Sequence, residues 1–132
     1  APMKFLIVVQ GGPYTSQASL SAWHFARAVL TRGHEIYRIF FYHDGVYNAN
    51  GLLSPPQDEV NLHEAWRLLA EENDLEIVIC VASALRRGIL DQTEASRYEK
   101  PLGNVEAPFI ISGLGQLIDG TINADRTMTF GS

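Results

Sequence analysis

The chain has 132 residues, a formal net charge of −5 and a sequence pI of about 5.2. This length suits a single core, so we expect residues 1–132 to form one domain. The basic residues form no cluster, which argues against direct binding to a nucleic-acid backbone. The apolar runs are too short to span a bilayer, and a single cysteine excludes an internal disulfide or a multi-cysteine metal site.

Charged residues make up 19% of the chain, whereas a typical globular domain carries about 25%. This shortfall indicates that another subunit covers part of the surface. One cysteine fits a reducing compartment, and the Gly/Pro turn at 10–13 interrupts the apolar start at 3–9 too early for a signal peptide. We therefore expect a cytoplasmic protein, in which Ala1 and Pro2 are a remnant of an expression vector.

Short β-type runs alternate with helical patterns along the chain. Apolar, β-branched and aromatic residues predict strands at 5–9, 35–42, 75–81, 109–111 and 126–130, the last near an edge. Strands that alternate with helices imply right-handed crossovers and a parallel sheet covered on both faces. The predicted fold is therefore three-layer α/β, with a flavodoxin-like, doubly wound and mostly parallel sheet of about five strands.

Helices are predicted from apolar residues at helical spacing. One stripe follows a cap at Thr15 or Ser16 and stops at Gly33. A second helix is predicted to end near residues 72–74. Asp91 and Glu94 form a capping pair for a third, short helix, and Ser112 is predicted to cap the last helix. The stripes consist of Ala18, Ala22, Phe25 and Val29, then Leu62, Ala65, Trp66 and Leu69, then Leu114, Leu117, Ile118 and Ile122. Residues 43–56 are predicted to be a long loop, either functional or disordered.

Cys80 ends the third predicted strand, where ligands and chemistry gather in open α/β sheets. A thiol there, facing helix amides with Arg86 and Arg87 downstream, favours a thiolate and hence a nucleophile. The alternative is a cysteine that packs as a small hydrophobe. Arg86 and Arg87 either raise the local potential around the sulfur or are solvated surface residues.

Two loops lie at the same predicted edge of the sheet. Residues 42–50 leave the second strand and either wall in the Cys80 pocket, with His43 moving a proton, or form an ordinary Asn/Gly loop. Residues 10–17 stand where flavodoxin-like proteins bind phosphate, but they lack both glycine-rich phosphate motifs, which favours a helix-capping turn. His24, His34 and His63 have no ligand-spaced partners, so no metal site is expected.

Several segments together resemble the DsrE/TusD family of sulfurtransferase subunits. The resemblance covers nearly the whole chain from Met3 and is weakest at 98–107. The segments that carry it are 40–50 (FFYHDGVYNAN), Ser54-Pro55, Asp58-Glu59, 79–88 (ICVASALRRG), Asp91 with 93–95 (TEA), 112–117 (SGLGQL) and 124–126 (ADR).

The resemblance implies a flavodoxin-like subunit of a heterohexamer, with two related small partners (DsrF and DsrH, or TusC and TusB). The family's sulfur-accepting cysteine falls on Cys80, which holds sulfur as a persulfide. Tyr42, His43, Asn48, Arg86 and Arg87 are supporting candidates. The relay runs between upstream and downstream carriers (TusA-like, and DsrC- or TusE-like), without metal, flavin, membrane or direct nucleic-acid contact.

That relay ends either in 2-thiolation of the tRNA wobble uridine or in dissimilatory sulfur oxidation, and both branches share these motifs. Two other readings of the chain stay open. One is a flavodoxin-like module that binds a nucleotide or flavin at 11–16. The other is a non-catalytic scaffold subunit in which Cys80 is buried.

Overall fold

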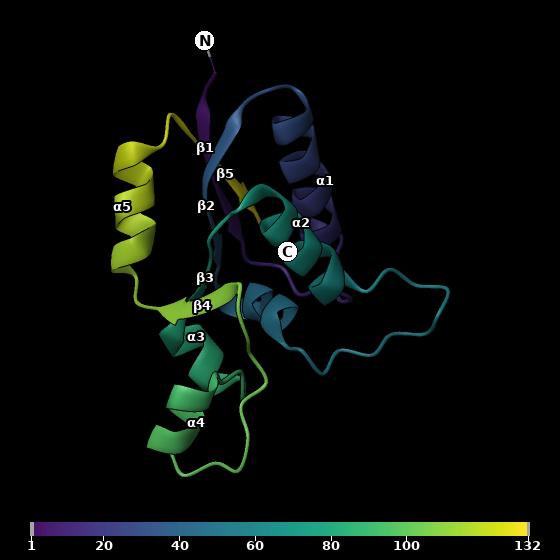
Figure 1. The fold of residues 1–132 in the computed structure, drawn as a ribbon, viewed down its shortest axis with the longest axis vertical. Helices are drawn as coiled ribbons and strands as arrows, with labels where there is room; N and C mark the ends of the chain where they lie inside the picture. Colours follow the sequence, from purple (N-terminus) through teal and green to yellow (C-terminus); the bar gives the residue numbers. More distant parts are fainter. Residues whose placement is uncertain (1, 132) are drawn as a thin grey trace.

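The computed structural model describes residues 2–131 and contains, within them, a five-stranded sheet between layers of helices (Figure 1). The strands are β1 (Lys4–Val9), β2 (Glu35–Phe41), β3 (Ile77–Cys80), β4 (Phe109–Ser112) and β5 (Arg126–Phe130). Their order is β4-β3-β2-β1-β5, and every neighbouring pair runs parallel. The predicted flavodoxin-like α/β fold, including β5 at an edge, is confirmed.

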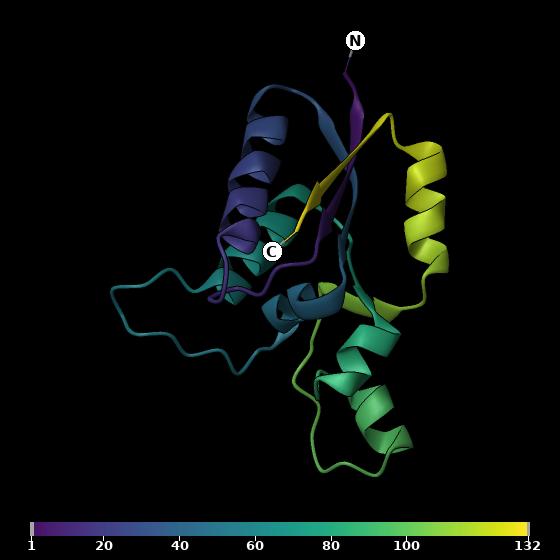
Figure 2. The same cartoon turned by 180° about the vertical axis from the view of Figure 1, so that it is seen from behind.

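Helices cover the two faces of the sheet unequally. Figures 1 and 2 show α1 (Ala18–Thr31) and α2 (Leu62–Asn73) on one face and α5 (Gly115–Asn123) alone on the other. The short helices α3 (Val81–Arg86) and α4 (Gln92–Arg97) extend beyond the carboxyl ends of the strands, near the 3₁₀ helix η1 (His43–Ala49). One face therefore has a thick core and the other a thin cover.

The thick core lies between the sheet and the pair α1 and α2. Trp66 of α2 is fully buried, and its ring meets that of Phe41 edge-on at 5.2 Å between centroids. Around them, side chains of β1, β2 and β3 are almost completely buried on both faces, which is typical of central parallel strands. β5, by contrast, is largely exposed, as its polar composition requires.

The single helix α5 is held to the sheet by a polar anchor. Nη1 of Arg38, on β2, donates to Oδ2 of Asp119 at 2.8 Å and to the carbonyl oxygen of Gln116 at 3.0 Å. The Tyr37 hydroxyl also donates to Asp119 at 2.8 Å. Gly120 lets the helix approach closely, because a Cβ there would stand 2.9 Å from Cδ1 of Leu6.

Three details differ from the sequence-based expectations. The segment 43–56 is not a loop throughout, because η1 occupies its first half with Val46 and Ala49 buried. Ser112 belongs to β4, and α5 begins after Leu114 without a side-chain cap. Gln17, rather than Thr15 or Ser16, precedes α1, although the Ser16 hydroxyl accepts from the Ala18 amide at 3.3 Å.

The apolar stripe predicted for the last helix is real, but most of it does not enter this core. Leu117 is partly buried, whereas Leu114, Ile118 and Ile122 are 46%, 59% and 75% exposed. These three side chains lie four residues apart and therefore share one face of α5. We call them the α5 stripe.

Replacing Trp66 by alanine should lower the free energy of unfolding by about 3–5 kcal/mol, because it leaves a cavity in the main core. Urea unfolding followed by circular dichroism measures this loss. Leu102→Ala is the control, because that side chain is 77% exposed and its removal should change stability by less than about 0.5 kcal/mol. Equal losses in the two variants would place the core elsewhere.

The anchor of α5 should make stability depend on pH at Asp119. Hydrogen bonds from Arg38 and then Tyr37 hold the pKa of the Asp119 carboxyl below its usual value. A depressed folded-state pKa adds stability above the usual value, and that stability disappears as pH falls through the folded-state value. Asp119→Asn should therefore be less stable than the wild type at pH 7, and denaturant unfolding should show the difference shrinking in acid. A difference that stays constant down to strongly acidic pH would contradict this assignment.

Candidate active site

Cys80 is the last residue of β3 and the residue that precedes α3. It pairs with Ser112 of β4 across the sheet, so it stands at the carboxyl edge. Its position in the strand alternates with that of Ile79, which directs its side chain to the face covered by α5. The predicted placement at the end of the third strand is confirmed.

The Cys80 side chain lies in a small apolar cluster. Phe40 and Val78 are its buried companions, and Tyr42 and Leu117 pack against the cluster as partly buried neighbours. Cys80 is only 1% exposed. A nucleophile has to be accessible, and in this chain by itself the Cys80 thiol is not, because Tyr42 and Leu117 of α5 close over the strand end.

The expected contact between the sulfur and helix amides is also missing. Cys80 occupies the capping position of α3 without a capping hydrogen bond from its side chain. The helix itself has only six residues, so it has little dipole to offer an anion. In this conformation the thiol is held by packing, like a small hydrophobe.

Tyr42 packs against the cluster, and the next residue, His43, lies against the Tyr42 ring. Their rings stack with centroids 4.0 Å apart, and the Tyr42 ring stands 6.1 Å from that of Phe40. His43 has a positive φ of 49° and is exposed, and its backbone amide donates to the hydroxyl of Ser83 at 3.1 Å. The exposed imidazole is thus linked to the covered thiol through the Tyr42 ring.

The two arginines after Cys80 have different surroundings. Arg87 Nε is 2.8 Å from Oδ1 of Asp44, and its Nη1 donates to the carbonyl oxygen of Ser83 at 3.1 Å. Arg87 thereby joins α3 to η1. Arg86 is exposed and lines a groove further along α3. Neither guanidinium donates to the sulfur among the described residues, so a direct role in stabilising it stays a prediction.

Asn48 is completely buried and holds η1 in place next to the carboxyl edge of the sheet. Its Nδ2 donates to the Ser19 hydroxyl and to the Gly45 carbonyl oxygen, both at 2.9 Å. The backbone carbonyl oxygen of Asn48 is 3.0 Å from Nδ1 of His63. Asn48 therefore connects η1 to α1 and α2 and fixes the segment that carries Tyr42 and His43, while its supporting role in the chemistry stays a prediction.

Leu117 and Ser83 are two residues of this site that the sequence did not single out. Leu117 belonged to a predicted apolar stripe, but nothing in its spacing indicated that it, rather than Ile118, would meet the cysteine cluster. Ser83 follows Cys80 by three positions, and its backbone and side chain hold Arg87 and His43 respectively. Both contacts depend on how distant segments meet, which spacing alone does not reveal.

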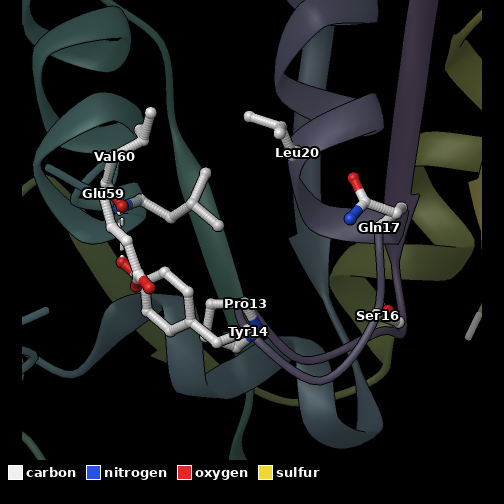
Figure 3. A pocket seen from close by; sticks show the side chains of 8 residues that line it. Pro13, Tyr14, Ser16, Gln17, Leu20, Glu59 and Val60 are labelled. Carbon is white, nitrogen blue, oxygen red and sulfur yellow. Dashed lines mark hydrogen bonds between the residues drawn. The ribbon is translucent and has the colours of Figure 1, made fainter.

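The turn at 11–16 lies beside a separate cavity of about 270 Å³ (Figure 3). Its wall is formed by Pro13, Tyr14, Ser16, Gln17, Leu20, Glu59, Val60 and Leu62. The Tyr14 hydroxyl donates to the Val60 carbonyl oxygen at 2.7 Å and accepts from the Leu62 amide at 3.1 Å. With a carboxylate and no basic side chain in the wall, this cavity does not favour a phosphate group.

Within 2–131, no group of three or more His, Cys, Asp or Glu is placed to hold a metal ion. Over the same range, no helix combines the length and apolar composition needed to cross a membrane.

The fold and this edge define a class: a flavodoxin-like α/β protein with a solitary cysteine where a central strand ends. The solved structure of the ychN protein from E. coli has this fold, with a TM-score of 0.73 at 21% identity, and the match covers 97% of this chain and 99% of that one. The model of the DsrE/DsrF-like family matches residues 3–130. The chain belongs to that family.

Curated relatives are similar in sequence to this chain over nearly their full length. DsrE of Allochromatium vinosum is 53% identical over 98% of this chain and 99% of its own. Sulfurtransferase TusD of Salmonella dublin and of Salmonella enteritidis are each 47% identical over 97% of this chain and 100% of theirs. The resemblance found in the sequence is confirmed, and the chain is a sulfurtransferase of the DsrE/TusD type.

Because the cluster covers the sulfur, Cys80 should react with an aromatic disulfide reagent far more slowly in the native protein than after unfolding. Leu117→Ala should speed the native reaction, because it removes a side chain packed against the cluster. Absorbance of the released thiolate measures both rates, with Leu102→Ala as the exposed control. Equal rates in native and unfolded protein would show that the cover does not protect the thiol.

Proposed function

We propose that Cys80 is the sulfur-carrying residue of this sulfurtransferase. The observation that carries the proposal is that the sequence contains one cysteine, so no other thiol can hold a persulfide. Its place at the carboxyl end of β3, where ligands reach an open parallel sheet, supports the same assignment. A solitary cysteine also has no second thiol in the same chain with which to form an internal disulfide.

The reaction is a thiol–persulfide exchange. The Cys80 thiolate attacks the outer sulfur of a donor persulfide, R–S–SH, and the S–S bond of the donor breaks. The electron pair of that bond leaves with the donor sulfur as a thiolate, which takes up a proton, and Cys80 becomes Cys80–S–SH. An acceptor thiolate then attacks the outer sulfur in the same way, so no net oxidation occurs in either step.

Exchange requires the sulfur to be uncovered. α5 is the removable part of its cover, because Gly120 is the one residue of that helix that is fully buried. Leu117 and the Arg38–Asp119 pair hold it, while Tyr42 closes the remaining side. A shift of α5 or of the Tyr42 ring would open the strand end without disturbing the main core on the opposite face.

Membership of this family implies that the protein works in a complex. We propose two related small subunits as its partners, of the DsrF and DsrH or the TusC and TusB kind, in a cytoplasmic heterohexamer. The α5 stripe supports this, because an exposed apolar row on one helix face favours burial against another protein. Sulfur would pass from a TusA-like to a DsrC- or TusE-like carrier, for tRNA 2-thiolation or for sulfur oxidation.

Mass spectrometry after incubation with a low-molecular-weight persulfide should show the wild-type protein heavier by one sulfur atom. Cys80→Ser should stay at its own mass, because the attacking thiolate is gone. Dithiothreitol should remove the added sulfur from the wild type, since a persulfide is reducible. Equal loading of the two proteins would refute the assignment of Cys80.

The burial of Cys80 favours one competing function, a scaffold subunit whose cysteine is only structural. The two functions differ when the partner subunits are present. A carrier should accept sulfur at Cys80 in the assembled complex, whereas a scaffold should remain unloaded there while a partner subunit gains the sulfur. Mass spectrometry of the separated subunits distinguishes these outcomes.

A further inference from the structure

A groove of about 370 Å³ lies at the C-terminal end of α3, against the connection to α4 and the residues that follow α4. Its walls are Leu85, Arg86, Gly88, Leu90, Tyr98 and Lys100. The floor is therefore aliphatic and aromatic, and the two charged residues of the rim are both cations. No carboxylate lines it.

Both cations of this rim lack a carboxylate partner within residues 2–131. The whole chain has a net charge of −5, and Arg38, Arg67, Arg87 and Arg97 each pair with a carboxylate. Arg86 and Lys100, by contrast, have no carboxylate within 4.0 Å among the described residues. Two unpaired cations beside an apolar floor match a ligand that combines apolar side chains with negative charge.

The groove is connected to Cys80 through the surface of α3. Two pairs of residues four apart each share one face of α3. Val81 and Leu85 are partly buried, and Ala82 and Arg86 are exposed, so each pair follows a line along the helix surface. These lines begin next to Cys80 and end in the groove. Cys80 and Leu85 are five residues apart, which is about 8 Å along the helix axis. An extended peptide covers that length in two or three residues, at about 3.3 Å each.

We infer that this groove is the docking site for an acidic, apolar peptide segment of a sulfur-carrier protein, whose own cysteine lies two or three residues from the apolar anchor. The inference rests on the proposed function of Cys80. It adds the chemistry of the partner: leucine- or phenylalanine-type side chains for the floor and carboxylates for Arg86 and Lys100. Tyr98, 51% exposed, supplies an aromatic face for the anchor.

Fluorescence anisotropy with two labelled peptides tests the site. The acidic probe carries two leucines, two glutamates and a cysteine three residues beyond the leucines, and the basic probe has lysines in place of the glutamates. Binding is measured in the Cys80→Ser protein, where no disulfide to the probe can form. The acidic probe should bind, more weakly as salt is raised, and the basic probe should bind at least about tenfold more weakly.

The double variant Arg86→Glu, Lys100→Glu should weaken binding of the acidic probe by about tenfold or more, because both attractions become repulsions. The control Lys4→Glu, Arg126→Glu makes the same change in charge at the opposite edge of the sheet, where β1 and β5 begin. It should bind as the parent does. Circular dichroism confirms that both doubles are folded, as expected for exposed positions.

Equal affinity for the two probes, or an equal loss of acidic-probe affinity in both double variants, would contradict the groove as the docking site. Binding would then be due to general electrostatic attraction. This outcome is separable from a failure of the proposed function. If Cys80 takes no sulfur from a low-molecular-weight persulfide either in the isolated protein or in the assembled complex, Cys80 is not the carrier, whatever the peptides do. If it is loaded and the probes show no preference, the carrier docks elsewhere.

Discussion

Parallel pairing of the central strands is the constraint on which the rest of this molecule depends. β1, β2, β3 and β4 point the same way, so their carboxyl ends lie at one edge, and the segments that follow them must meet there. This is why Tyr42, His43 and Ser83, which come from two different connections, surround the end of β3. The interior residues of these strands are buried on both faces, which leaves little freedom to shift the register.

The two faces of the sheet serve different purposes. α1 and α2 build a thick core around Trp66 and Phe41, which supplies most of the apolar burial. α5 lies alone on the other face, held by Leu117, the close contact at Gly120 and the ion pair between Arg38 and Asp119. Because Cys80 belongs to the thin face, its exposure can change without the loss of the main core. The sulfur atom that we propose as the carrier thus lies where motion costs least.

A sulfur carrier has to protect its persulfide and also release it. Packing among Phe40, Val78 and Leu117 excludes water and other thiols, whereas transfer requires a partner thiol to reach the same atom. The basic groove at the far end of α3 and the α5 stripe both follow Cys80 along the chain. They are two separate surfaces, one with a cationic rim and one apolar, that we propose as docking sites for different proteins.

Much of this architecture was predictable because local patterns dictate it. Apolar runs predicted all five strands to within two residues at every end. Asp91 with Glu94 marked the start of α4, where the Asp91 carboxylate accepts from the Glu94 amide at 2.8 Å. Cys80 at the end of β3 followed from the same reasoning. η1 was missed because its helical turns depend on burial of Val46 and Ala49 against distant strands, not on a local signal.

By itself, the sequence determined the element order, the parallel sheet and the solitary cysteine at the end of a strand, because periodicity and residue type act locally. Only the tertiary structure decided that the thiol is covered, that Arg87 binds Asp44 while Arg86 enters a groove, and that most of the α5 stripe faces outward. Those outcomes depend on which faces of distant segments meet. Contacts of that kind are set by the packing of the whole chain.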